Sequence, residues 1–168
     1  MTIKDSIGAI DLLKPNAYTE GQKVAWLSEL DTSIYWQLVR KVNPNDDYDP
    51  DKTYNTGDTV DFGETPYVCQ ADGVSESPED APDSWAAETW AGYDSTDNAF
   101  DEDTVLLAPV PYDIPLYTNW LAMKISLFNR EIQHYNNESL LFNMAWGNLA
   151  NHLVRSFRPV AKATHFRL

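Results

Sequence analysis

A strongly acidic stretch separates the two parts of this chain whose hydrophobic residues repeat with helical spacing. Residues 45–103 hold 18 of the 26 acidic side chains and a single basic one, Lys52, so this stretch carries a net charge of −17. The rest of the chain has eight acidic and eleven basic residues and carries +3. Two electrostatically different parts therefore share one chain of 168 residues, which is long enough for a modest core with a small insert.

The residues before the acidic stretch predict two helices. Apolar side chains recur every three or four residues from Ile3 to Leu13, and Pro15 ends this pattern because the residue before a proline avoids the helical conformation. Thr19 and Gln22 have the spacing of a capping box, which predicts the start of a second helix of about six turns. Its apolar stripe consists of Val24, Leu27, Leu30, Ile34, Leu38 and Val42.

The residues after the acidic stretch predict an extended segment and then a helical hairpin. Two prolines within residues 105–111 favour extended backbone. A long helix is expected to begin with Asp113 as its cap and to break at Asn136–Asn137, and a last helix is expected to end at residue 157.

The long helix after Asp113 has an unusually wide apolar face, which covers about half of its circumference. Such a helix must pack against more than one neighbour. The neighbours are either other helices of the same fold or another subunit. For the second alternative, the candidate subunit-packing residues are Tyr117, Trp120, Leu121 and Phe128.

The acidic stretch has β-type and loop-type patterns. Residues 54–63 and 65–70 predict short strands and turns, residues 75–84 predict a loop, and residues 93–103 are expected to be mobile. Its aromatic side chains form either a thin core or an exposed platform on which a sugar ring or another protein could stack. The candidates are Tyr54, Tyr67, Trp85 and Trp90.

These patterns together predict a mainly α fold. We expect a bundle of about four helices, with a small β-rich module inserted between the second and third helices and an extended C-terminal arm. The expected boundaries are 1–44 for the first part of the helical body, 45–103 for the acidic module with its linkers, 104–157 for the helical hairpin and 158–168 for the basic arm.

The sequence lacks the motifs that carry catalysis or bind cofactors. It has no glycine-rich phosphate loop, no Gly-x-Ser-x-Gly elbow and no His-Glu-x-x-His pair. The single cysteine, Cys69, has no partner for a disulfide or a zinc site. The acidic residues 45–51 lack the central glycine and the terminal glutamate of an EF-hand loop. We therefore expect no enzymatic activity, no cofactor and no bound metal.

The net charge of −14 argues against a broad basic surface for nucleic acid. No apolar stretch approaches the ~20 residues of a membrane-spanning helix, and the first residues contain no apolar run of the signal-peptide type. We expect a protein without a membrane partner that stays in the cytoplasm in which it is made.

Segments in both helical parts carry a family likeness. They are Trp26-Leu27-x-x-Leu30-Asp31-x-x-Ile34, Leu106-Leu107-Ala108-Pro109-x-Pro111-Tyr112-Asp113-x-x-x-Tyr117, Asn129-x-Glu131-x-x-x-Tyr135-Asn136-Asn137 and Phe142-Asn143. This pattern resembles the head-tail connector (adaptor) proteins of siphophages and prophages, and the resemblance covers about 110 residues.

The adaptor resemblance implies a mostly helical virion protein of the phage neck, between capsid and tail. It implies that about twelve copies form a ring below the portal protein, that a stopper or tail-completion protein follows, and that DNA passes through the ring without specific binding. In such adaptors the C-terminal arm docks onto the portal. The residues that fit this role are Arg155, Arg158, Lys162 and Arg167, and the alternative is an ordinary solvated tail.

The acidic module carries a second likeness, in Tyr54-x-x-Gly57-Asp58-x-Val60, Gly63, Tyr67, Pro82 and Trp85. This pattern is similar to small chitin- or cellulose-binding modules of the chitinase-associated type. It leaves open an alternative function, in which the chain binds carbohydrate or a cell surface through the module. A third alternative is that the module faces the DNA channel, where its negative charge lets DNA slide without sticking.

Overall fold

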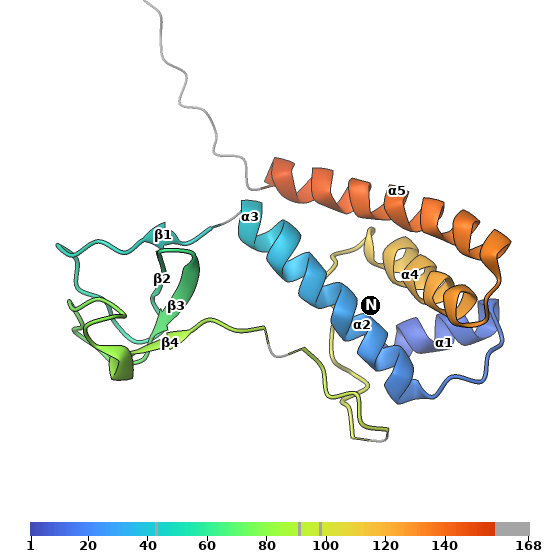
Figure 1. Ribbon diagram of the computed structural model, residues 1–168, viewed down its shortest axis with the longest axis horizontal. Helices are drawn as coiled ribbons and strands as arrows, with labels where there is room; N and C mark the ends of the chain where they lie inside the picture. Colours follow the sequence, from blue (N-terminus) through green and yellow to red (C-terminus); the bar gives the residue numbers. More distant parts are fainter. Residues whose placement is uncertain (43, 91, 98, 157–168) are drawn as a thin grey trace, which may run out of the picture. The chain divides into compact units, whose positions relative to one another are not determined.

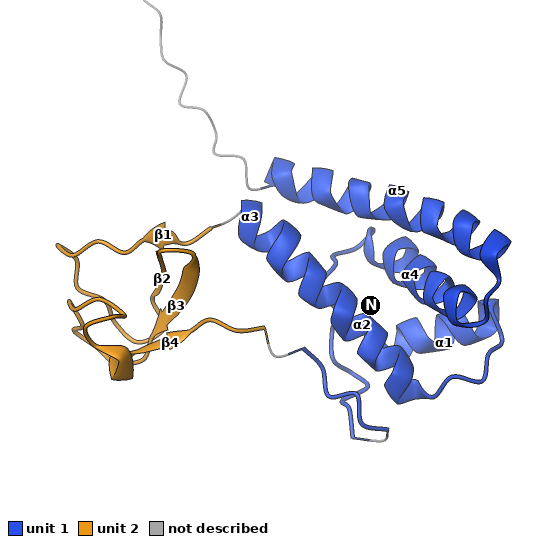
Figure 2. Ribbon diagram, viewed as in Figure 1, with its two compact units in different colours: residues 1–42, 92–168 blue, residues 43–91 orange. Residues whose placement is uncertain are grey.

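The computed structural model describes residues 1–156 apart from 43, 91 and 98, and it divides the chain into two compact units (Figures 1 and 2). The helical unit comprises residues 1–42 together with the chain from Gly92 onward, and the β unit comprises Asn43–Ala91. The expectation of a mainly helical chain with a small β-type part is confirmed in outline. The acidic residues 92–103 belong to the helical unit and not to the module, which moves the expected boundary at residue 103.

The helical unit is built from segments that the apolar spacing predicts. The elements are α1 (Ile3–Leu13), α2 (Glu20–Ile34), a π-helical turn (Tyr35–Val39), α3 (Arg40–Val42), α4 (Asp113–Phe128) and α5 (Ile132–Ser156). The predicted capping box is present at α2, where the backbone N–H of Gln22 donates to Thr19 Oγ1 over 3.2 Å and the side chain of Gln22 accepts from Thr19 N over 3.0 Å. The helix that follows runs through the π-helical turn without a break to Val42.

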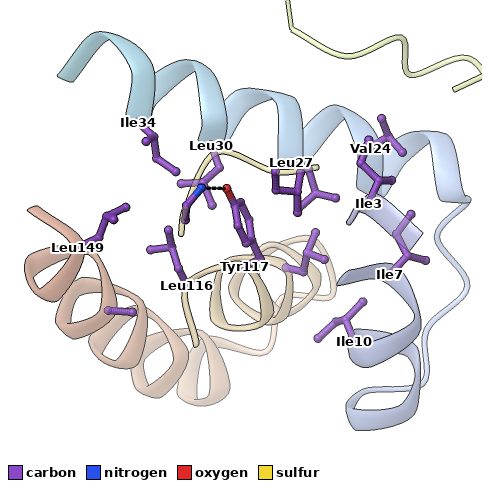
Figure 3. Close-up of a cluster of buried hydrophobic side chains, with 14 of the residues drawn as sticks. Ile3, Ile7, Ile10, Val24, Leu27, Leu30, Ile34, Leu116, Tyr117 and Leu149 are labelled. Carbon is purple, nitrogen blue, oxygen red and sulfur yellow. Dashed lines mark hydrogen bonds between the residues drawn. The ribbon is translucent and has the colours of Figure 1, made fainter. Parts of the chain in front are cut away.

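Helix α4 lies at the centre of the helical unit and contacts α1, α2 and α5 (Figures 1 and 3). This arrangement accounts for most of the wide apolar face, because three neighbours of the same chain cover it, although Ile114 and Phe128 remain more than half exposed. The side chains of Tyr117 and Leu121 are fully buried in this core. Neither has surface left for another subunit, so the subunit-packing prediction is wrong for these two residues.

The turn between α4 and α5 is centred on Arg130, six residues before the predicted break at Asn136–Asn137. Arg130 adopts the left-handed conformation (φ 59°), its N–H donates to the Leu127 carbonyl, and the N–H of Glu131 donates to the Ser126 carbonyl. These two bonds form a Schellman motif, which satisfies carbonyl groups at the end of α4. Asn136–Asn137 lie exposed inside α5. The predicted break there is therefore wrong, since solvent-facing asparagines are tolerated in a helix that packs on its opposite side.

We expect Arg130→Gly to stabilise the protein by about 0.5–1 kcal/mol, because glycine adopts positive φ without the clash that Cβ makes there. The free energy of unfolding in urea measures this gain. Arg130→Ala, which removes the side chain but keeps Cβ, is the matched control and should give no comparable gain. A destabilised glycine variant would mean that the Arg130 side chain matters more than its backbone conformation.

The segment before α4 is non-helical, as its two prolines predict, and Val105 forms a single antiparallel bridge with Thr2. Asp113 was expected to cap α4. Instead it is the first residue of the helix, and the Tyr112 side chain before it makes no capping hydrogen bond. The carboxylate of Asp113 is buried and accepts a hydrogen bond from the amino group of Met1 over 3.1 Å. This contact ties the start of α4 to the segment that precedes α1.

The β unit is a four-stranded sheet in the order β1 (Asp46–Asp47), β2 (Thr59–Phe62), β3 (Thr65–Cys69) and β4 (Trp85–Ala87). Strands β2 and β3 form a hairpin whose turn contains Gly63 at φ 64°, a conformation that favours glycine. The core of the unit is small, as expected for about fifty residues. It consists of Tyr54, Val60, Cys69, Val74 and Trp85.

Candidate functional site

A buried carboxylate joins the segments that carry the adaptor-like pattern. Asp31, on α2, has no solvent exposure. Its carboxylate accepts hydrogen bonds from the Tyr117 hydroxyl over 2.5 Å, from the backbone N–H of Leu107 over 3.0 Å and from the Tyr93 hydroxyl. The Tyr117 hydroxyl in turn accepts from the backbone N–H of Ala108 over 2.8 Å (Figure 3). We call Asp31, Tyr93, Leu107, Ala108 and Tyr117 the Asp31 cluster.

Burial dominates the electrostatics of this cluster. It raises the pKa of the Asp31 carboxyl, although the three donors around it act in the opposite direction. Burial and the neighbouring Asp31 carboxylate raise the pKa values of Tyr93 and Tyr117 well above the ordinary tyrosine value, so both hydroxyls remain protonated donors. Because the polar groups of the cluster bond to one another inside the core, the arrangement holds chain segments together and presents no reactive group to a substrate.

Residues 92–108 apart from 98, which we call the strap, belong to the helical unit and carry three members of the cluster, Tyr93, Leu107 and Ala108. The backbone N–H of Tyr93 donates to Ser28 Oγ over 2.9 Å, and Asp97 accepts from the backbone N–H of Gly21 over 2.7 Å. The side chain of Phe100 packs against the helical core. The sequence predicts mobility for residues 93–103, whereas the structure fastens this segment to α2. The acidic composition of this segment predicts a solvated linker, although Tyr93 and Phe100 within it contact the helical unit.

Gly21 leaves the space in which the strap approaches α2. A Cβ atom there would overlap with the Ser95 carbonyl oxygen and lie 2.5 Å from Asp97 Oδ1. We therefore expect Gly21→Ala to lower the free energy of unfolding by about 1–3 kcal/mol, despite the better helix propensity of alanine. Gly8→Ala in α1 is the matched control. No atom lies within 4 Å of its Cβ position, so it should stabilise by up to about 1 kcal/mol.

A second polar group fastens α1 to the α4–α5 turn. Lys14 Nζ lies 2.9 Å from Glu131 Oε2 and 3.0 Å from Glu138 Oε1, and it also donates to the Ser126 hydroxyl. The bond to Lys14 lowers the pKa of the Glu131 carboxyl. These two ion pairs join residues more than 110 positions apart, a contact that local sequence patterns do not indicate. A groove of about 370 Å³ lies beside it, lined in part by His134.

The remaining predicted subunit-packing residues lie on or near the surface of the helical unit. Trp120 is partly buried and donates from Nε1 to the Trp26 carbonyl over 2.7 Å. Phe128 is more than half exposed and stacks on the Trp26 ring, with 5.4 Å between ring centroids. Of the four candidates, Phe128 alone retains a largely exposed side chain.

The sequence reasoning missed a group of exposed apolar residues on α5. The exposed fractions are 62% for Leu140, 49% for Leu141, 60% for Met144 and 47% for Val154. Leu140, Met144 and Val154 face away from Ala145, Leu149 and Leu153, which pack into the core, whereas Leu141 lies one helical turn before Ala145. One sequence feature could have indicated these exposed apolar residues, since residues 139–154 contain no Asp, Glu, Lys or Arg.

Three of the four aromatic candidates of the β unit, Tyr54, Tyr67 and Trp85, lie in its core or pack against it. Trp85 and Tyr54 are buried and pack edge to face with 5.3 Å between ring centroids, and Trp85 Nε1 donates to the Glu76 carbonyl over 3.0 Å. Tyr67 and Trp90 are partly buried. Of the two alternatives for these side chains, the structure supports the core for Tyr54 and Trp85.

Of the predicted portal-docking residues, Arg155 is exposed at the end of α5. Arg158, Lys162 and Arg167 lie outside the described residues. Within the described part of the chain, no group of three or more His, Cys, Asp or Glu side chains is arranged to hold a metal ion. In the same part, no helix combines the length and the apolar character needed to cross a membrane.

Comparison of the chain with protein-family models, with curated proteins and with solved structures finds no match.

Proposed function

We propose that this chain is a structural protein of a tailed-phage virion, a head-to-tail adaptor located in the neck. In this proposal about twelve copies form a ring that joins the portal protein to the tail, and a stopper or tail-completion protein binds the ring from the tail side. The acidic module is an insertion between the second and third helices of the adaptor body. The chain has no catalytic role.

The Asp31 cluster is the observation that carries this proposal. The adaptor-like pattern lies in segments more than 70 residues apart, and four of its residues, Asp31, Leu107, Ala108 and Tyr117, meet in one network of hydrogen bonds. A chance likeness in short segments gives no reason for these residues to contact one another. Because these residues contact one another, the separate segments of the pattern belong to one packed unit. This is expected if the helical unit is an adaptor body.

The distribution of charge supports a subunit that conducts DNA without retaining it. The helical unit has 13 acidic and 11 basic residues, whereas the β unit has 13 acidic residues and only Lys52 as a basic one. Affinity for DNA comes mainly from the neutralisation of phosphates by basic side chains. Neither unit has the excess of basic residues that tight DNA binding requires.

Electron microscopy of the virion tests this function. We expect density for the helical unit as a ring in the neck, and we expect particles made without this chain to accumulate as filled heads that do not join tails. Particles made with the Gln70→Glu variant, which changes one exposed side chain of the β unit, are the matched control and should join tails normally. Finding the chain outside the neck would refute the proposal, as would normal joining of heads and tails in its absence.

The carbohydrate-binding alternative loses much of its support because Tyr54 and Trp85 are buried. All described aromatic residues of the β unit are buried or partly buried. A stacking platform, in contrast, needs exposed ring faces. We expect the full chain to show no retention on chitin or cellulose. Retention that survives high salt would restore this alternative.

A further inference from the structure

A groove between α2, α4 and α5 is open to solvent although aromatic rings line it. Its volume is about 210 Å³, and its lining includes Trp120 of α4 together with Phe142 and Trp146 of α5. The ring centroids of Trp120 and Phe142 lie 5.0 Å apart, and those of Phe142 and Trp146 lie 6.0 Å apart. All three residues are only partly buried, so the rings form an apolar wall that the described part of the chain leaves uncovered. We call this site the aromatic groove.

The polar side chains that line the aromatic groove are neutral. They are Ser33 of α2, Gln37 of the π-helical turn and Asn143 of α5, and none of the described residues in the lining is charged. Single π-helical turns within α-helices are frequent at functional sites. Amide side chains both donate and accept hydrogen bonds, as a peptide backbone does. The lining therefore suits an aromatic side chain with the peptide groups that flank it.

The chain itself supplies such a segment after α5. Residues 157–168 lie outside the described residues, and they contain two phenylalanines, Phe157 and Phe166, and no acidic side chain. Ser156, which precedes this segment, is the last residue of the helix that carries Phe142 and Trp146. The segment and the groove are thus joined by one helix of known length.

The distance along α5 decides which phenylalanine can reach the aromatic groove. Trp146 lies ten residues before Ser156, which corresponds to about 15 Å along the helix axis. Phe157 directly follows Ser156 and is separated from it by only about 4 Å of chain. Phe166 follows ten residues after Ser156, and ten extended residues span up to about 35 Å. Phe166 can therefore return to the groove, whereas Phe157 cannot.

A carboxylate at the rim of the aromatic groove suits the residue after Phe166. Lys124 Nζ lies 4.5 Å from the centroid of the Trp120 ring and 2.6 Å from Glu29 Oε2. The Glu29 side chain is half exposed, so its carboxylate remains open to a second cation. Arg167 can occupy that position when Phe166 fills the groove, because neighbouring residues of an extended chain lie only about 3.8 Å apart.

We propose that residues 157–168 fold back along α5 and place Phe166 in the aromatic groove of the same chain. This inference does not depend on the proposed function. In an adaptor whose C-terminal arm docks onto the portal, the groove retains the arm until the portal displaces Phe166. The contact is then autoinhibitory, since one segment cannot occupy both sites.

Paramagnetic relaxation in the full chain tests this inference. Thr164→Cys introduces a thiol two residues before Phe166, and a nitroxide spin label attached to it broadens the NMR signals of nearby residues. Cys69 is buried and should remain unlabelled. We expect the amide signals of Gln37 and Asn143 to broaden more than that of Arg155, although Arg155 is closer to the label along the chain.

Two phenylalanine variants of the labelled chain provide the comparison. We expect Phe166→Ala to lower the equilibrium constant for docking at least about tenfold, because the aromatic side chain that the groove buries is lost. The broadening at Gln37 and Asn143 should fall accordingly. Phe157→Ala is the matched control, since it removes the same side chain from a position that cannot reach the groove, and it should leave the broadening unchanged.

Broadening that is strongest at Arg155 would overturn the inference, as would broadening at the groove that persists in Phe166→Ala. A mixture of isotope-labelled chain without the spin label and spin-labelled chain without the isotope shows whether the segment comes from another copy. Broadening of the groove signals in this mixture would also overturn the inference, because a second copy would then occupy the groove.

Discussion

Asp31→Ala is expected to lower the free energy of unfolding by about 3–5 kcal/mol, because it leaves the Tyr93 hydroxyl, the Tyr117 hydroxyl and the Leu107 N–H inside the core without their acceptor. A domain is stable by only about 5–15 kcal/mol, so this loss is a large fraction of the whole. The strap should loosen first at Tyr93 and Leu107, since both donate hydrogen bonds to Asp31. Urea unfolding measures the loss, and hydrogen exchange at Leu107 and Ala108 reports the loosening.

Two further variants test whether the loss of stability comes from the hydrogen bonds of Asp31. Asp31→Asn retains one acceptor oxygen, so we expect an intermediate loss of about 1–3 kcal/mol. Glu64→Gln removes an exposed charge at the β2–β3 turn and should change the free energy of unfolding by less than about 0.5 kcal/mol. If Asp31→Ala were as mild as Glu64→Gln, the Asp31 cluster would not hold the strap.

The stability difference between the wild type and Asp31→Asn is expected to depend on pH. Burial raises the pKa of Asp31 above its ordinary value of 3.8, so the folded protein binds this proton more readily than the unfolded chain. The resulting stabilisation is complete below the ordinary pKa and is lost as the pH rises through the raised pKa of the folded state. Asp31→Asn lacks this titration. We therefore expect the stability advantage of the wild type over Asp31→Asn to be larger at pH 4 than at pH 7.

Trp85→Ala is expected to unfold the β unit while the helical unit remains folded. The substitution removes the largest side chain of a five-residue core, a loss of about 3–5 kcal/mol that a module of this size cannot absorb. Dispersed amide resonances of residues 46–87 should collapse in NMR spectra, and those of the helices should remain. Trp36→Ala, which removes a partly exposed tryptophan of the helical unit, should leave both units folded.

The Trp85 variant also decides between the two interpretations of the aromatic residues. A stacking platform predicts that Trp85→Ala keeps the β unit folded and abolishes binding to chitin or cellulose. If Trp85 is a core residue, Trp85→Ala unfolds the β unit, and the wild type does not bind chitin or cellulose. Retained amide dispersion in the variant would contradict the core assignment.

Local patterns were sufficient for the helices but not for their connections. The capping box at Thr19 and Gln22 marked the start of α2 correctly, because its hydrogen bonds join residues three apart. The α4–α5 turn was placed at Asn136–Asn137, although it lies at Arg130. Beside that turn, Lys14 forms ion pairs with Glu131 and Glu138 from more than 110 residues away, a contact that no local pattern indicates.

The strap shows the same difference in the candidate site. Its acidic composition is typical of a solvated linker, and no local pattern distinguishes Tyr93 from an exposed tyrosine. The buried carboxylate that binds Tyr93 lies 62 residues earlier in the chain. Conversely, Asp31 reads as one polar residue beside an apolar stripe, and its burial is evident only when the strap covers it.

The sequence alone determined the acidic stretch that separates the two helical parts of the chain. It also determined the apolar stripes of the helices, because charge and periodicity are local properties. Tertiary structure decided which residues of that stretch form the β unit and which belong to the helices, and which apolar faces are covered. A stripe states that a helix has an apolar side but does not identify its neighbour. The contacts of α4 with α1, α2 and α5 cover most of its wide apolar face, and only the structure shows that Ile114, Leu127 and Phe128 remain exposed.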